Sequence, residues 1–81
     1  MKLLFTFGSG QLRDFMVGNP NDVLLVVDGK DWEDCRKQVF SFKGIEDKFC
    51  TSYDYSERDE FLNKWDMREY TLTDLDKVRR I

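Results

Sequence analysis

The sequence predicts an α+β fold, with a small mixed sheet of about four strands and two helices in the order β-loop-β-α-β-α-β. Four short segments alternate apolar with polar residues or are continuously apolar, which is typical of strands. Two other segments repeat apolar residues every three or four positions behind a capping residue, which is typical of helices. The 81 residues suffice for one hydrophobic core, so we expect a single domain over residues 1–81.

The first two strands are expected on either side of a long loop. Residues 2–7 alternate, with three apolar side chains on one face, and end at a pair of glycines. Residues 23–27 are continuously apolar and β-branched at both ends, which predicts a strand covered on both faces. Residues 8–22 between them are rich in Gly, Asn and Asp. Because so long a connection in a small domain often carries function, we expect a site there first.

A helix is expected to follow the second strand. Asp31 can cap it, and Gly44 can supply a left-handed stop. The residues at helical spacing between them should face the core; they are Trp32, Cys35, Val39 and Phe42.

The remaining elements follow the same logic. Residues 49–55 alternate with an aromatic face and predict a third strand, and Ser56 can cap a second helix over residues 57–66. Residues 67–73 alternate again and predict a fourth strand, whereas 74–81 suggest at most one helical turn. We expect both helices on one face of the sheet. The apolar patch of the second helix is Phe61, Leu62 and Trp65.

Composition narrows the function classes. The formal net charge of −3 argues against a general DNA- or RNA-binding protein, since such affinity comes from Lys and Arg. No segment has the apolar length of a membrane span, and the N-terminus does not read as a signal peptide, so the cytoplasm is the expected compartment and no membrane partner is expected. Cys35 and Cys50, on different predicted elements, are expected to be reduced thiols.

The absence of histidine removes the common catalytic designs. Ser-His-Asp and Cys-His arrangements and histidine-ligated metal sites all require it. The acids at 28, 31 and 34 lack the glycine and the terminal glutamate of a calcium loop. We therefore expect no catalytic residue, no metal and no cofactor. A carboxylate-based enzyme acting on a nucleotide is the weakest alternative, because 16 acids in this chain cluster by chance.

The turn formed by Gly8, Ser9, Gly10 and Gln11 is a candidate ligand loop. Two glycines around a small hydroxyl residue let backbone N–H groups converge on an anion or a base edge, and Gln11 offers both a donor and an acceptor. The turn lacks the third glycine of a dinucleotide fingerprint and the lysine of a P-loop. An ordinary turn therefore stays open as the alternative.

Positive and aromatic side chains elsewhere can complete such a site. Tyr53 and Tyr55 can stack on a base, whereas Trp32 and Trp65 are expected in the core. Positive groups from several elements can meet a phosphate, or can simply be solvated. They are Arg13, Arg36, Lys37 and Arg68.

The first strand ends Phe5-Thr6-Phe7-Gly8-Ser9-Gly10-Gln11, and an apolar strand, an arginine-bearing helix and a tyrosine-bearing strand follow. In this the chain resembles small phage proteins with the motif Phe-Thr-Phe-Gly-x-Gly-Gln, the phage anti-CBASS sponge family. The resemblance implies a homo-oligomer, a tetramer, in the host cytoplasm. It also implies that the protein binds a cyclic dinucleotide such as 3′3′-cGAMP without cleaving it, so that host anti-phage signalling is blocked.

The resemblance also implies a set of binding residues. The turn backbone and Gln11 would contact base edges, Arg13 or Arg36 a phosphate, and Tyr53 would stack on a base. Ser9 stands where the family pattern has a larger residue, which bears on nucleotide specificity. The full expected set is Thr6, Gly8, Ser9, Gly10, Gln11, Arg13, Arg36 and Tyr53.

A second function class remains open. A small acidic phage protein can bind a host defence protein directly and block its basic nucleic-acid-binding surface. The net negative charge, with Asp and Glu on both predicted helices, supports this alternative. The apolar strip around Phe61 and Trp65 is the expected surface that makes the oligomer.

Overall fold

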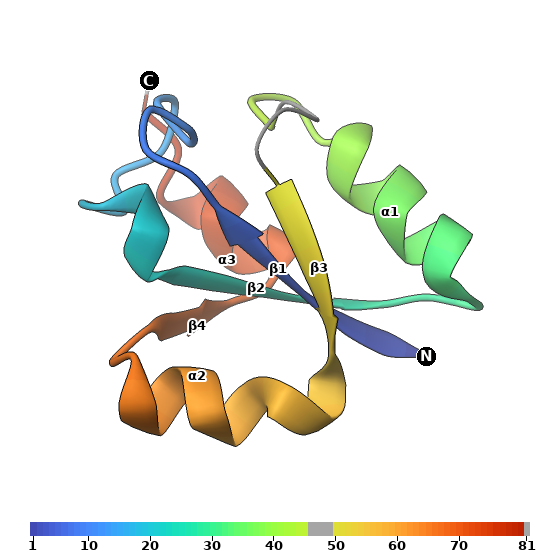
Figure 1. The fold of residues 1–81 in the computed structure, drawn as a ribbon. Coiled ribbons are helices and arrows are strands. Elements are labelled where there is room, and N and C mark those ends of the chain that lie inside the picture. Colours follow the sequence, from blue (N-terminus) through green and yellow to red (C-terminus); the bar gives the residue numbers. More distant parts are fainter. Residues whose placement is uncertain (46–49, 81) are drawn as a thin grey trace.

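A computed structural model describes residues 1–45 and 50–80, which form a small α+β fold with a four-stranded mixed sheet, as predicted. Figure 1 shows the elements in chain order. The strands are β1 (Lys2–Phe7), β2 (Val23–Asp28), β3 (Cys50–Asp54) and β4 (Arg68–Tyr70). The α-helices are α1 (Trp32–Phe40), α2 (Arg58–Lys64) and α3 (Leu72–Lys77), and two short 3-10 helices are η1 (Pro20–Asp22) and η2 (Tyr55–Glu57).

The sheet has the strand order β3-β1-β2-β4. β1 pairs antiparallel with both β2 and β3, and β2 pairs parallel with β4. The two central strands are apolar on both sides, since Leu4 and Leu24 are as fully buried as Leu25. This confirms the prediction that the apolar run of β2 is covered on both faces.

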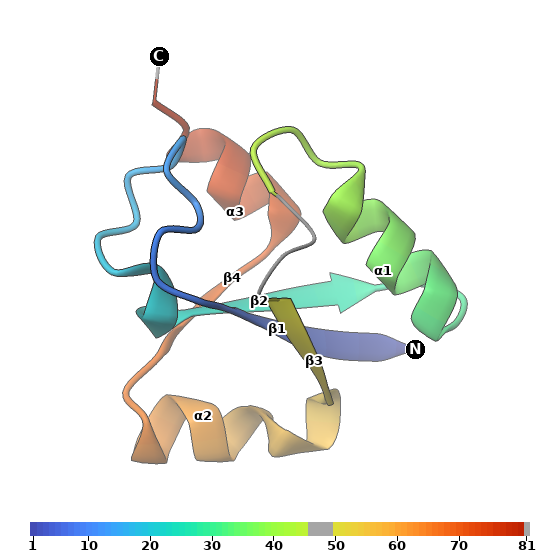
Figure 2. The ribbon, with the colours of Figure 1, turned by 45° about the horizontal axis from the view of Figure 1, so that its top comes forward.

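One face of the sheet carries the hydrophobic core beneath α1 and α3 (Figure 2). Alternate residues of β1 and β2 point to this face, because successive strand side chains alternate. Cys35 and Val39 of α1 and Leu75 of α3 meet them, and the ring of Phe5 packs edge-on against Phe40. The two central strands contribute Leu3, Phe5, Phe7, Val23, Leu25 and Val27.

Helix α1 begins where the sequence predicts. The Asp31 carboxylate accepts from the backbone N–H of Asp34 at 2.8 Å and caps the helix. Gly44 has a φ of 98°, as expected for a left-handed residue, although the helix itself ends at Phe40. The prediction that Trp32 packs in the core is wrong, because Trp32 is the first residue of α1 and is 48% exposed. Its indole N–H instead donates to the Ser52 hydroxyl at 3.3 Å.

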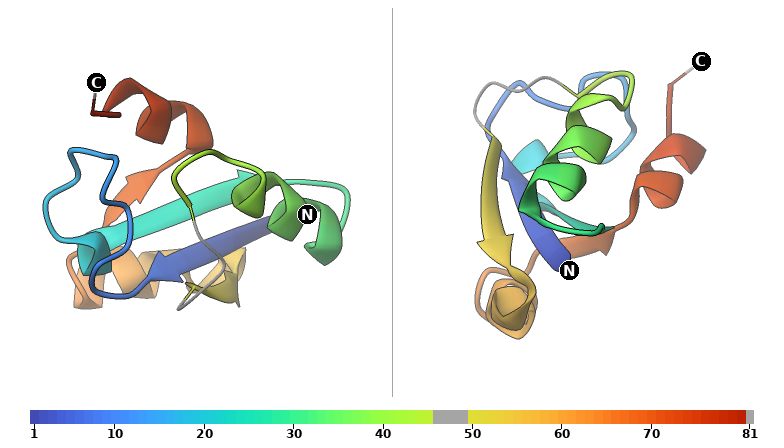
Figure 3. Two further views of the ribbon diagram at one scale, coloured as in Figure 1. Left: turned by 90° about the horizontal axis from the view of Figure 1, so that it is seen from above. Right: turned by 90° about the vertical axis from the view of Figure 1, so that its right-hand side faces the viewer.

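Helix α2 lies on the opposite face of the sheet from α1 and α3, so the expectation that the two predicted helices share one face is wrong (Figure 3). The second face also carries apolar strand residues that need cover, because Leu4 and Leu24 alternate with the core residues. The expected cap is also displaced. The Asp54 carboxylate accepts from the Ser56 N–H at 2.9 Å and starts η2, after which α2 begins at Arg58.

The C-terminal part departs most from the prediction. The expected strand over 67–73 is shortened to Arg68–Tyr70, because Thr71 and Asp74 form a reciprocal capping box that starts α3. Leu72 therefore lies in a helix, and Leu75 is fully buried in the core.

The loop after β1 is folded against the core. Leu12, Phe15 and Val17 are buried, and the chain after α3 runs alongside the loop. The N–H of Met16 donates to the Val78 carbonyl at 2.7 Å, and the N–H of Arg80 donates to the Asp14 carbonyl at 2.7 Å. The loop that sequence reasoning proposed as a site is thus also a structural part of the fold.

Cys35 and Cys50 are not joined by a disulfide bond, in line with the expectation of reduced thiols. Residue 49, with which the third strand was expected to begin, lies outside the described residues. Within residues 1–45 and 50–80, no helix has both the length and the apolar character required to cross a membrane.

Candidate functional site

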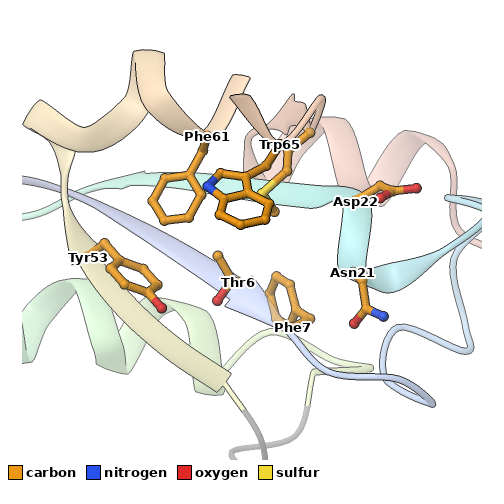
Figure 4. A pocket seen from close by; sticks show the side chains of 8 residues that line it. Thr6, Phe7, Asn21, Asp22, Tyr53, Phe61 and Trp65 are labelled. Carbon is orange, nitrogen blue, oxygen red and sulfur yellow. The ribbon is translucent and has the colours of Figure 1, made fainter. Parts of the chain in front are cut away.

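A cavity of about 380 Å³ opens between α2 and the sheet, and we call it the aromatic cavity (Figure 4). Its walls come from four elements and from the residues that follow α2. The lining residues are Thr6 and Phe7 of β1, Asn21 and Asp22 of η1, Tyr53 of β3, Phe61 of α2, and Trp65 and Met67 beyond it.

The register of β1 and β3 places the side chains of Thr6 and Tyr53 at the floor of this cavity. Leu4 is paired with Tyr53, and Thr6 with Thr51, in the antiparallel ladder of β1 and β3. Because alternate residues share a face, Thr6 and Tyr53 point to the same side of the sheet, toward α2. Sequence reasoning selected both residues as ligand contacts, and the structure brings them into one cavity.

The aromatic wall is completed by α2 and the residue that follows it. The rings of Tyr53 and Phe61 meet edge to face, with their centroids 4.9 Å apart and their planes at 61°. Trp65 is the C-cap residue that follows α2 and is 59% exposed, which overturns the expectation that it packs in the core. Figure 4 shows the Trp65 indole beside the Phe61 ring, above Thr6. The cavity therefore presents aromatic faces that a flat ligand can contact.

The polar end of the cavity is supplied by η1. Pro20 occupies the first turn of η1, and the Asn19 side chain accepts from the Asn21 N–H at 3.0 Å. The Asn21 amide in turn donates to the Ser9 hydroxyl at 3.3 Å. This bond links the aromatic cavity to the glycine turn, although the turn itself is not among the lining residues.

The glycine turn is a β-turn closed by its own backbone. The N–H of Gln11 donates to the Gly8 carbonyl at 3.3 Å, and Gly10 at the third position has a φ of 85°, which suits a glycine. The Arg13 guanidinium donates to the Gly10 carbonyl at 3.0 Å. Arg13 is therefore directed at its own turn, while Ser9 and Gly10 stay exposed.

Arg36 lies apart from the other expected ligand contacts. It belongs to α1, on the face of the sheet opposite the aromatic cavity (Figure 3). Its guanidinium carbon lies 4.7 Å from the centre of the Phe40 ring and 5.4 Å from that of Trp32. The structure therefore separates Arg36 from Thr6 and Tyr53.

A second cavity of about 240 Å³ adjoins the first, and we call it the polar cavity. Asp22 lines both cavities. The other walls of the polar cavity carry mostly polar or charged groups. One of them is Arg68 of β4, which the sequence indicated as a possible phosphate contact. The lining residues are Val17, Gly18, Asn19, Asp22, Val23, Asp66, Arg68 and Tyr70.

The charge of the aromatic cavity follows from its lining. Among its described lining residues, the only charged side chain is the carboxylate of Asp22. Such a cavity favours an uncharged aromatic group over a phosphate, because a nearby like charge is unfavourable to an anion. In the described segments, no three His, Cys, Asp or Glu side chains gather closely enough to hold a metal ion.

Among the described residues, four groups with shifted pKa values lie outside the aromatic cavity. Burial raises the pKa of the Cys35 thiol, and the hydrogen bond to Glu69 raises the pKa of Arg58. Backbone N–H donors lower the pKa values of Asp54 and Asp74. None of these four groups is among the residues that line the aromatic cavity.

Sequence reasoning missed the contributions of η1 and α2 to the cavity. The Asn19-Pro20 pair was a signal for a short helical turn, since Asn is a preferred N-cap and Pro suits the first helical position. Nothing in the local pattern indicated that Asn21 and Trp65 would face the same space. No protein-family model, curated protein or solved structure matches this chain.

Proposed function

We propose that this protein is a binding protein without catalytic activity that sequesters a cyclic dinucleotide, holding one of its bases in the aromatic cavity. Such a sponge would deprive a host anti-phage effector of its signal by mass action, as the resemblance implies. The observation that carries the proposal is the convergence of Thr6 and Tyr53, from two strands, with the rings of Phe61 and Trp65 in one open cavity.

The chemistry of the cavity supports a nucleobase. Bases stack on aromatic side chains with about 1–3 kcal/mol each, and the exposed indole of Trp65 offers such a face. The Thr6 hydroxyl and the Asn21 amide both donate and accept hydrogen bonds, as base edges require. A volume of about 380 Å³ lies within the range of small-molecule sites.

The charge distribution supports a particular orientation. Since the only charged group on the described lining is a carboxylate, the phosphates would lie at the mouth of the cavity and the base inside. Trp65 is exposed at this mouth, and a second copy of the chain in a homo-oligomer, a tetramer by the resemblance, would cover it.

The test is isothermal titration of the protein against cyclic di- and trinucleotides, followed by recovery and chromatography of the ligand. We expect binding with the ligand recovered intact. Tyr53→Ala should weaken it roughly 5- to 150-fold, in line with the loss of one stacking contact. Tyr55→Ala is the matched control, because Tyr55 is also half-buried but does not line the aromatic cavity. Absence of binding across the panel, or recovery of a cleaved ligand, would refute the proposal.

A second candidate is direct binding of a host defence protein. It is favoured by the exposure of two tryptophans, Trp32 and Trp65, on a chain with a net charge of −3, since tryptophan is enriched in interface hot spots. Affinity capture from host lysate distinguishes the two candidates. One stoichiometric protein, lost in the Trp65→Ala variant, would support the inhibitor, and an empty capture would support the sponge.

A further inference from the structure

We propose that the polar cavity is a second subsite of the same ligand site and that it selects guanine. This inference rests on the proposed nucleotide-binding function. The polar cavity lies directly beside the aromatic cavity, because Asp22 lines both. A ligand that fills one cavity therefore borders the other, and the polar cavity governs which nucleotide is accepted.

The charged side chains of the polar cavity form no hydrogen bond or ion pair with each other or with the rest of the described chain. These side chains belong to Asp22, Asp66 and Arg68. All three residues are exposed. Asp22 comes from η1, and Asp66 and Arg68 come from the junction between α2 and β4, so the fold brings two distant segments together at one small space.

The balance of these charges excludes a phosphate as the preferred occupant. Two carboxylates and one guanidinium sum to one negative charge among the described lining residues. An anion would meet a net like charge, whereas a neutral group avoids this penalty. The preferred group must offer N–H donors to the carboxylates and acceptors to Arg68.

Guanine is the nucleobase that meets this requirement most fully. Its N1–H and N2 amino group are adjacent donors suited to a carboxylate, and its O6 and N7 are adjacent acceptors suited to a guanidinium. Adenine has a single amino group, and its N1 is an acceptor that would face a carboxylate unfavourably. Asn19 and Tyr70 add further hydrogen-bonding groups to the same walls.

The backbone conformation of Asp66 allows a direct test of the guanine subsite by substitution. Asp66 has a φ of 53°, in the left-handed region, where asparagine is one of the few other side chains that are well tolerated. Asp66→Asn therefore removes the negative charge without straining the left-handed backbone at residue 66. Asp59→Asn is the matched control, because it removes the same charge from a residue of α2 outside both cavities.

The experiment measures the affinities of cyclic di-GMP and cyclic di-AMP by isothermal titration for the wild type and both variants. We expect the wild type to prefer the guanine ligand by about tenfold or more, the difference expected of one bidentate contact. Asp66→Asn should reduce the preference for the guanine ligand severalfold, and its unfolding midpoint in denaturant should equal that of the wild type. Asp59→Asn should keep the full preference for the guanine ligand.

The two proposals fail in different ways. If both ligands bind equally well, or if Asp66→Asn keeps the full preference for guanine, the subsite is refuted while the aromatic cavity retains its role. If the wild type binds neither these nor other cyclic nucleotides, the proposed function is refuted and the subsite with it.

Discussion

The two faces of the sheet differ in how completely they are packed. On the face of α1 and α3, Val39 and Leu75 are fully buried, and the loop residue Phe15 closes the remaining space. On the face of α2, the helix has no buried residue, and an open cavity lies between it and the strands. The same central strands, β1 and β2, serve both faces through alternate residues.

This difference indicates that one face of the sheet mainly provides stability and that the other mainly provides the binding surface. Stability grows with the apolar area removed from water, so most of it should come from the α1 and α3 face. The α2 face leaves Trp65 exposed and the Tyr53 ring in contact with a cavity, which is what a binding surface requires. Variants on the two faces should therefore separate the free energy of unfolding from ligand affinity.

Leucine truncation on each face gives the largest expected contrast. Leu75→Ala removes a fully buried side chain from the core and should lower the free energy of unfolding by about 2–5 kcal/mol. Leu62→Ala makes the same change on α2, where the side chain is only half-buried, and should have a clearly smaller effect. Urea unfolding followed by circular dichroism measures both. Equal losses would show that the α2 face is as important to stability as the core.

The next largest difference in stability is expected between arginine variants on the two faces. The Arg79 guanidinium lies 4.9 Å from the Phe15 ring centre and 5.0 Å from that of Phe42, and it donates to the Lys43 carbonyl at 2.8 Å. Arg79→Ala should destabilise the protein by about 1–2 kcal/mol, because a stacking contact and a hydrogen bond are both lost. Arg79→Lys should recover only part of this, since lysine lacks the planar guanidinium.

The control for this prediction is Arg58→Ala on the other face. Arg58 pairs with Glu69 at 2.6 Å, with the two side chains 34% and 32% exposed, but its guanidinium stacks on no described ring. Its removal should change the unfolding midpoint less than the removal of Arg79. A larger effect at Arg58 would contradict the division between the faces.

The parts of the fold that the sequence predicted are those decided by local pattern. The alternation of β1, the apolar run of β2 and the Asp31 cap each depend on a few neighbouring residues, and each is confirmed. Helix α3 was also signalled locally by Thr71 and Asp74, but the alternation around Tyr70 competed with it. The capping box prevails because it satisfies two backbone N–H groups and lets Leu75 enter the core.

The site depended on information that no local pattern contains. Thr6 was expected from the resemblance and Tyr53 from the aromatic face of its strand, yet only the register of β1 and β3 brings them together. Arg36 and Arg68 were equivalent as positive residues in the sequence. The structure distinguishes them because α1 and β4 lie at different places relative to the cavities, with Arg68 alone of the two lining one.

The smallest expected effect compares the carboxylates that start the helices of the two faces. Asp74 accepts from the Thr71 N–H at α3, and Asp54 accepts from the Ser56 N–H ahead of α2. These bonds lower both pKa values, so each carboxylate stabilises the fold above the ordinary aspartate pKa. That contribution is lost as the pH falls below about 4 and through the lower pKa of the folded state.

Asp74→Asn and Asp54→Asn should therefore flatten the dependence of the melting temperature on pH between about pH 5 and 2, because the neutral amide does not titrate. The flattening should be greater for Asp74→Asn, since α3 anchors the fully buried Leu75, whereas α2 has no buried residue whose loss would follow the loss of its cap. Thermal unfolding at a series of pH values measures this. Should Asp54→Asn flatten the profile more, the start of α2 would contribute more to folding than the packing of the two faces indicates.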